Sequence, residues 1–76
     1  MSGITLRQLL MSINRFENIR IEDEFGRDCI RTTPWEALQT LTDEQLEQKY
    51  DYIRLLRGKI TIGMSFEVYE EHFKIK

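Results

Sequence analysis

Residues 18–32, NIRIEDEFGRDCIRT, decide the fold of this chain. Isoleucines alternate with charged residues in NIRIE, which is the period of a strand with one buried and one solvated face. DEFGRD then forms a turn around Gly26, and CIRT returns. We therefore predict a β-hairpin over residues 18–32. Its predicted inward side chains are Ile19, Ile21 and Ile30, and its predicted outward side chains are Arg20, Glu22 and Arg31.

A helix is predicted before the hairpin, beginning at Thr5. Thr5 is a suitable N-cap, and Gln8 stands three residues later, which completes a capping box. Apolar residues then recur at helical spacing and mark one buried face. They are Leu6, Leu9, Leu10 and Ile13. We expect this helix to end near residues 14–15.

A second helical segment is predicted after the hairpin, over about residues 34–48. Thr33 is the N-cap candidate, and Pro34 suits the first helical position, whose N–H has no intrahelical partner. Glu36 would complete a second capping box. Thr42 with Gln45 would form a third box, at which the helix restarts.

Trp35 is the only tryptophan of the chain. It shares the spacing i, i+3, i+6 with Leu38 and Leu41, which favours a place in the core. The alternative is that Trp35 is offered to a partner, because tryptophan concentrates binding energy at protein interfaces.

The period after Tyr50 suits either a continued helix or two strands. β-Branched and aromatic enrichment favours strands from about residue 51, joined by a tight turn at Arg57–Gly58. KITIGM, residues 59–64, is the clearer strand. For the tail, residues 65–76, we expect another strand with Phe66 and Val68 on one face; a short helix over residues 67–73 is the alternative.

Together these elements predict one α+β domain spanning residues 1–76. We expect an antiparallel sheet of three to five strands, with the N-terminal helix and the second helical segment on one face. Exposed edge strands in so small a sheet favour pairing with another copy, so a homodimer is also expected.

Composition narrows the cellular setting. A net charge of −2 disfavours nucleic acid as a direct partner. The single cysteine suits a reducing compartment. The first 20 residues lack a basic start followed by an apolar stretch, so we expect no signal peptide, and the apolar runs of the sequence are too short to cross a membrane. We therefore expect a cytoplasmic protein with no membrane partner.

The sequence offers little catalytic chemistry, so we expect no enzymatic activity and no cofactor. Cys29 and the only histidine, His72, lie far apart in sequence with no third group to orient them. One cysteine and one histidine also make a poor zinc site. The acidic residues of the hairpin lack the regular ligand spacing of a calcium loop, so a solvated hairpin tip is expected there. These residues are Glu22, Asp23, Glu24 and Asp28.

The order of the motifs resembles a group of small proteins from bacterial phages and mobile elements. TLRQLL, IRIEDEFGRD, LTDEQLEQKYDYI, and a glycine followed by KITI carry the resemblance over about residues 4–62. The Trp35 segment and the tail after Gly63 depart from the pattern. The resemblance implies a phage or mobile-element context and carries over no functional residue.

Two binding hypotheses follow. The first is a non-catalytic module that engages or inhibits a host protein through surplus aromatic and acidic side chains. Its candidate residues are Trp35, Tyr50, Tyr52, Glu22, Asp23 and Glu24, with an acidic face completed by Asp43, Glu44 and Glu47. The second is binding of a small anionic ligand or nucleotide at a glycine turn. Its candidate residues are Arg54, Arg57 and Lys59.

Overall fold

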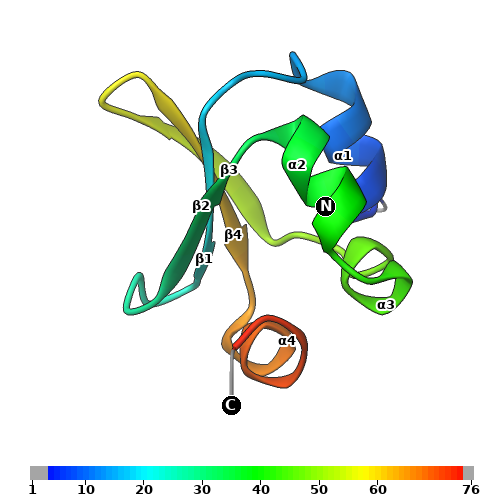
Figure 1. Ribbon diagram of the computed structural model, residues 1–76. Helices are drawn as coiled ribbons and strands as arrows, with labels where there is room; N and C mark the ends of the chain where they lie inside the picture. Colours follow the sequence, from blue (N-terminus) through cyan, green and yellow to red (C-terminus); the bar gives the residue numbers. More distant parts are fainter. Residues whose placement is uncertain (1–3, 75–76) are drawn as a thin grey trace.

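Eight elements follow one another in the computed structural model, which describes residues 4–74 (Figure 1). They are α1 (Leu6–Ser12), β1 (Ile19–Asp23), β2 (Cys29–Thr32), α2 (Pro34–Thr40), α3 (Asp43–Leu46), β3 (Tyr52–Leu56), β4 (Lys59–Met64) and α4 (Phe66–His72). The strands form one sheet in the order β2-β1-β4-β3. The predicted α+β class, the N-terminal helix and the hairpin are confirmed.

The sheet is mixed rather than purely antiparallel. β1 pairs with β2, and β3 with β4, in antiparallel hairpins, but β1 and β4 run parallel, with Ile19 beside Ile60 and Ile21 beside Ile62. The chain returns over α2 and α3 between the two hairpins, so β4 re-enters the sheet in the direction of β1. A period-2 pattern identifies the strands but does not say how distant hairpins meet.

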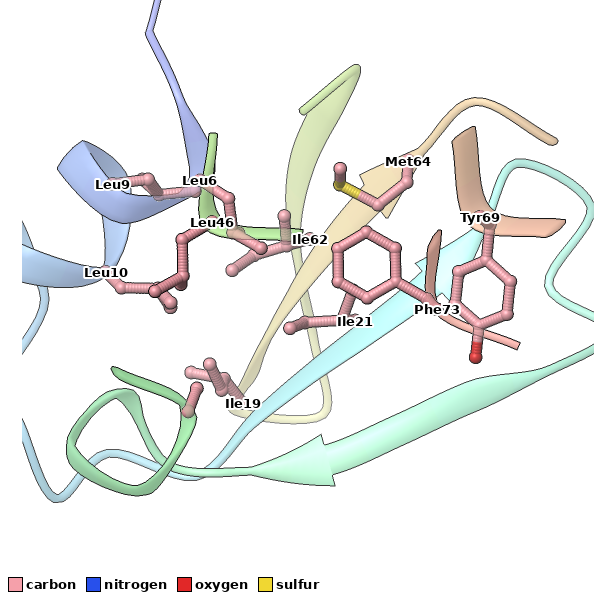
Figure 2. Close-up of a cluster of buried hydrophobic side chains, with 11 residues drawn as sticks. Leu6, Leu9, Leu10, Ile19, Ile21, Leu46, Ile62, Met64, Tyr69 and Phe73 are labelled. Atoms are coloured by element: carbon pink, nitrogen blue, oxygen red, sulfur yellow. The ribbon is translucent and has the colours of Figure 1, made fainter. Parts of the chain in front are cut away.

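The helices lie on one side of the sheet and enclose the core between helices and strands (Figures 1 and 2). Leu6 and Leu10 of α1 face Ile19, Ile21 and Ile62 of the two central strands. Among the described residues, the same buried cluster also contains Leu9, Ala37, Leu46, Met64, Tyr69 and Phe73. Burial of this apolar surface is the main contribution to the stability of so small a domain.

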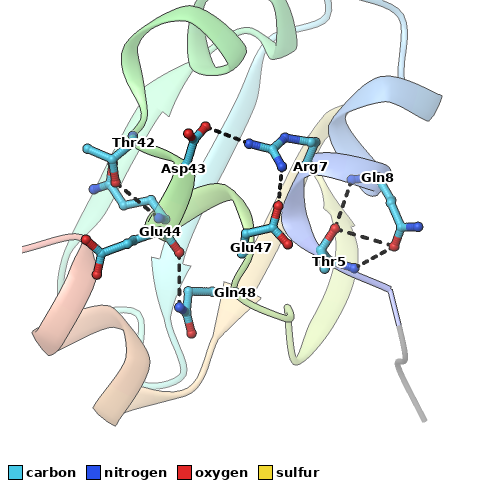
Figure 3. Close-up of polar contacts among 9 residues, drawn as sticks. Thr5, Arg7, Gln8, Thr42, Asp43, Glu44, Glu47 and Gln48 are labelled. Atoms are coloured by element: carbon cyan, nitrogen blue, oxygen red, sulfur yellow. Dashed lines mark hydrogen bonds and ion pairs between the residues drawn. The ribbon is translucent and has the colours of Figure 1, made fainter.

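Side-chain caps begin the helices where the sequence predicts them. The capping box of Thr5 with Gln8 is complete (Figure 3), and so is that of Thr42 with Gln45. At α2 the Thr33 hydroxyl accepts a hydrogen bond from the Glu36 amide. The reciprocal bond of this box is not made, because the Glu36 carboxylate accepts instead from the Thr32 hydroxyl, at 3.2 Å.

Residues 52–56 form a strand, which confirms the preferred reading of this segment. The turn that joins β3 to β4 places two residues in the left-handed region, Arg57 at φ 53° and Gly58 at φ 77°. Two consecutive positive φ values define the tight turn whose twist matches that of an antiparallel hairpin.

The strand predicted for the tail is wrong, and the alternative helix is right. α4 begins at an N-cap, Ser65, whose hydroxyl accepts from the Val68 amide. Tyr69 and Phe73 are buried one helical turn apart, with ring centroids 5.8 Å from each other. The buried residues of the tail therefore follow a helical period, although its aromatic residues are also typical of strands. Residues 75–76 lie outside the described part of the chain.

Across residues 4–74, no helix has the length and the apolar character needed to cross a membrane.

Candidate functional site

The sheet face opposite the described helices lacks helical cover, and its side chains come from alternate positions of all four strands. We call it the open face. One row across it consists of Arg31, Arg20, Thr61 and Arg54, and the next of Cys29, Glu22, Gly63 and Tyr52. Lys59 lies on the same face, two residues before Thr61. The face is therefore mainly cationic, although the whole chain carries a net charge of −2.

Glu22 points away from the helices as predicted, but it is buried and not solvated. Its side chain is only 3% exposed. Its Oε2 accepts hydrogen bonds from the Tyr52 hydroxyl, at 2.7 Å, and from the Arg54 guanidinium, at 3.0 Å. These charge-assisted bonds offset the cost of burying a carboxylate. Glu22 is thus a structural residue of the open face, and Arg54 is its ion-pair partner.

Tyr52 covers Glu22 because its ring lies directly over Gly63. A Cβ added at Gly63 would come within 2.1 Å of the Tyr52 ring, so only glycine leaves room for this placement. Burial, followed by the hydrogen bond to Glu22 and the charge of that carboxylate, raises the pKa of Tyr52 to about 12. Tyr52 therefore stays protonated and donates to Glu22 at physiological pH.

The acidic hairpin tip is not the solvated cluster that the sequence suggests. Asp23 is buried, and its Oδ1 accepts from the amides of Phe25 and Arg27, both at 3.0 Å, which stabilises the turn. Glu24 is exposed and accepts from the Phe66 amide at the start of α4. Among residues 4–74, no group of three or more acidic, histidine or cysteine side chains is arranged to hold a metal ion.

A pocket of about 270 Å³ opens where β1 begins, β2 ends and β4 starts. We call it the cationic pocket. The polar residues that line it include Asn18, Arg20, Arg31, Thr32, Glu36 and Lys59. Of the three predicted anion-binding residues, only Lys59 belongs to it, since Arg54 pairs with Glu22 and Arg57 lies in the β3–β4 turn.

Sequence reasoning missed Arg20 and Arg31 because it treated them as solvated hairpin positions. The β1–β2 register places these two residues directly opposite each other. The predicted hairpin, with its turn centred on Gly26, is sufficient to predict that these two residues lie opposite each other. The third cation, Lys59, joins them only through the parallel pairing of β1 with β4, which has no local signal.

Trp35 is not a core residue. Its side chain is 48% exposed, because the buried face of α2 is formed by Pro34 and Ala37 with the partly buried Leu38 and Leu41. Its amide donates to the Arg15 carbonyl, at 3.0 Å, which ties α2 to the loop before β1. Phe16 in this loop is 70% exposed. We call Phe16 and Trp35 the aromatic pair.

The other predicted partner-binding residues do not lie together on one surface. Tyr50 precedes β3 and is half-buried against the core, so it does not share a face with Tyr52. The acidic face of α3 is partly neutralised, since Arg7 pairs with Asp43 at 2.9 Å and also with Glu47 (Figure 3).

Cys29 and His72 are not brought together. Cys29 belongs to the open face, where its Sγ accepts from the Arg20 guanidinium at 3.5 Å. His72 ends α4 on the helical side of the sheet and lies 3.5 Å from a Glu71 carboxylate oxygen.

Comparison of the chain with protein-family models, with curated proteins and with solved structures gives no match. No functional residue is therefore carried over from another protein.

Proposed function

We propose that this protein is a non-catalytic binding module that recognises another protein through the aromatic pair and the adjoining cationic pocket. The observation that carries the proposal is the exposure of Trp35. A chain of 76 residues has little apolar surface to spare for its core, yet its only tryptophan is nearly half exposed. An exposed ring contributes little to the free energy of folding. A partner that covered the ring would bury its apolar surface, which would contribute much to the free energy of binding.

The composition around Trp35 supports a protein partner. Tryptophan and arginine are enriched at the centres of protein interfaces, where they supply most of the binding energy. Phe16 is joined to Trp35 through the backbone bond of Arg15, and Asn18 of the cationic pocket follows in the same loop. A single partner segment could therefore contact both apolar and cationic groups.

The resemblance to small proteins of phages and mobile elements supports a host protein as the partner. Such an accessory protein would act in the cytoplasm by engaging or inhibiting a host protein. The proposal includes no catalytic role because Cys29 and His72, the pair considered for nucleophilic chemistry, lie on different sides of the sheet.

The test is affinity capture from a bacterial lysate with the tagged protein and two variants. Trp35→Ala removes the proposed anchor, and Phe25→Ala removes another exposed aromatic, from the hairpin tip. We expect one host protein to be recovered at stoichiometric level by the native chain and by Phe25→Ala, and to be lost with Trp35→Ala. Circular dichroism verifies that each variant is folded. Recovery of the same protein by folded Trp35→Ala would contradict the proposal.

A further inference from the structure

We infer that the cationic pocket holds a single anionic side chain, a carboxylate or a phosphorylated residue, of the protein segment that the aromatic pair binds. This inference rests on the proposed function, because it names the chemistry of that partner. It begins from the placement of two arginines. Arg20 and Arg31 lie directly opposite each other on neighbouring strands, and like charges in that position repel. An anion between them would turn this repulsion into attraction.

The cations of the pocket have no acidic partner among the described residues, a property they share with Arg15, Arg27, Lys49 and Arg57. What distinguishes them is that three such cations line one pocket. Arg7, Arg54 and Lys74 each pair with a carboxylate. Among residues 4–74, no carboxylate lies within 4.0 Å of the charged nitrogens of Arg20, Arg31 or Lys59.

Glu36 lines the pocket but does not neutralise it. Its carboxylate accepts from the Thr32 hydroxyl, so the pocket keeps an excess of two positive charges, from three cationic side chains and one anionic.

The Arg20 guanidinium is held in place from one end. One of its terminal nitrogens contacts the Cys29 sulfur, a weak acceptor that does not compensate a positive charge. Its Nε is buried and has no hydrogen-bond partner within the described residues, and neither does the hydroxyl of its cross-strand neighbour Thr61. Buried donors without an acceptor are rare and costly. Thr61 does not line the pocket, but Arg20 does, and its guanidinium keeps hydrogen-bonding capacity that no described residue satisfies.

The size of the pocket limits the ligand to one such group. A volume of about 270 Å³ lies just below the roughly 300–1,000 Å³ of sites that enclose a whole drug-sized molecule. The rest of the ligand must lie outside the pocket, whose lining residues Asn18 and Glu36 are close in sequence to Phe16 and Trp35. The chain's net charge of −2 opposes long-range attraction of a polyanion, so a peptide with a local negative charge fits better than a nucleic-acid strand.

The experiment measures the melting temperature in inorganic phosphate and in sodium chloride of equal ionic strength. Native protein should melt higher in phosphate, since a ligand that binds only the folded state stabilises it. Arg31→Thr should lose this increase while melting no lower than the native chain in chloride, because the repulsion with Arg20 is removed. Arg57→Gln, which removes the same charge from the β3–β4 turn, should keep the increase. An equal phosphate effect in Arg31→Thr would overturn the inference.

Peptides then identify the natural group. Short peptides that place glutamate or phosphoserine next to leucine should shift the amide resonances of Asn18 and Arg20. The peptide that binds more tightly shows whether the partner's side chain is a carboxylate or a phosphorylated residue. Tighter binding of a single-stranded oligonucleotide at physiological salt would overturn the assignment to a protein. The phosphate measurement needs no partner, so it can fail while lysate capture through Trp35 succeeds, and the two failures are distinguishable.

Discussion

At the scale of single residues, the open face depends on one glycine. Gly63 leaves the space in which the Tyr52 ring lies, and Tyr52 in turn shields Glu22 from water while donating a hydrogen bond to it. Arg54 completes the arrangement from the edge strand. A buried carboxylate that lost these donors would be left with its desolvation cost uncompensated.

Gly63→Ala should therefore destabilise the protein by displacing the Tyr52 ring. Alanine is favoured over glycine in a strand, but the clash and the lost bond to Glu22 outweigh that gain, for a net cost of about 1–2 kcal/mol. Urea unfolding measures the change. Tyr52→Ser removes the clash, so the double variant should lose less stability than the sum of the two single variants. Strictly additive losses would show that the ring does not occupy this position.

At the scale of elements, local signals in the sequence predict where the helices and strands begin. The capping threonines at residues 5, 33 and 42 each begin a helix, and the alternation in NIRIE marks β1. The signals fail where two periods fit the same residues. Phe66 and Val68 suit a strand as well as a helix, and the Ser65 cap together with the packing of Tyr69 and Phe73 against the core favours α4.

The β3–β4 turn gives a prediction at this scale. Arg57 adopts φ 53°, a conformation that costs most side chains energy but that asparagine tolerates. Arg57→Asn should create the preferred Asn-Gly turn and stabilise the protein by about 0.5–1 kcal/mol. A gain of 1 kcal/mol raises Tm by roughly 4–8 °C in a domain of this size, so thermal unfolding detects it. Arg57→Gln should give no comparable gain; an equal gain would mean that charge, and not backbone conformation, is responsible.

At the scale of the whole molecule, the site arises from the pairing of β1 with β4. This parallel pairing brings Lys59 beside the arginines of the first hairpin, although the two segments are about 40 residues apart in sequence. It could not be predicted from the sequence, because a hairpin pattern specifies only its own two strands. For the same reason the sequence predicts Arg54 as free, whereas the folded sheet places it against Glu22.

Trp35 shows the limit of helical spacing as a guide to burial. Leu38 and Leu41 of the predicted stripe do pack against the core, but the fully buried positions of α2 are Pro34 and Ala37, and Trp35 is left exposed. The proposed function requires that the Trp35 ring be accessible in the folded protein. Because Trp35 is the only tryptophan, the whole tryptophan emission of the chain reports its surroundings.

Acrylamide quenching of this emission, compared between the native and the urea-unfolded protein, is the most direct test. With the ring 48% exposed, native emission should be quenched efficiently, at roughly half or more of the extent seen after unfolding, and its maximum should shift little on unfolding. Native emission that acrylamide hardly quenches, with a large red shift on unfolding, would place Trp35 in the core and contradict the proposed binding surface.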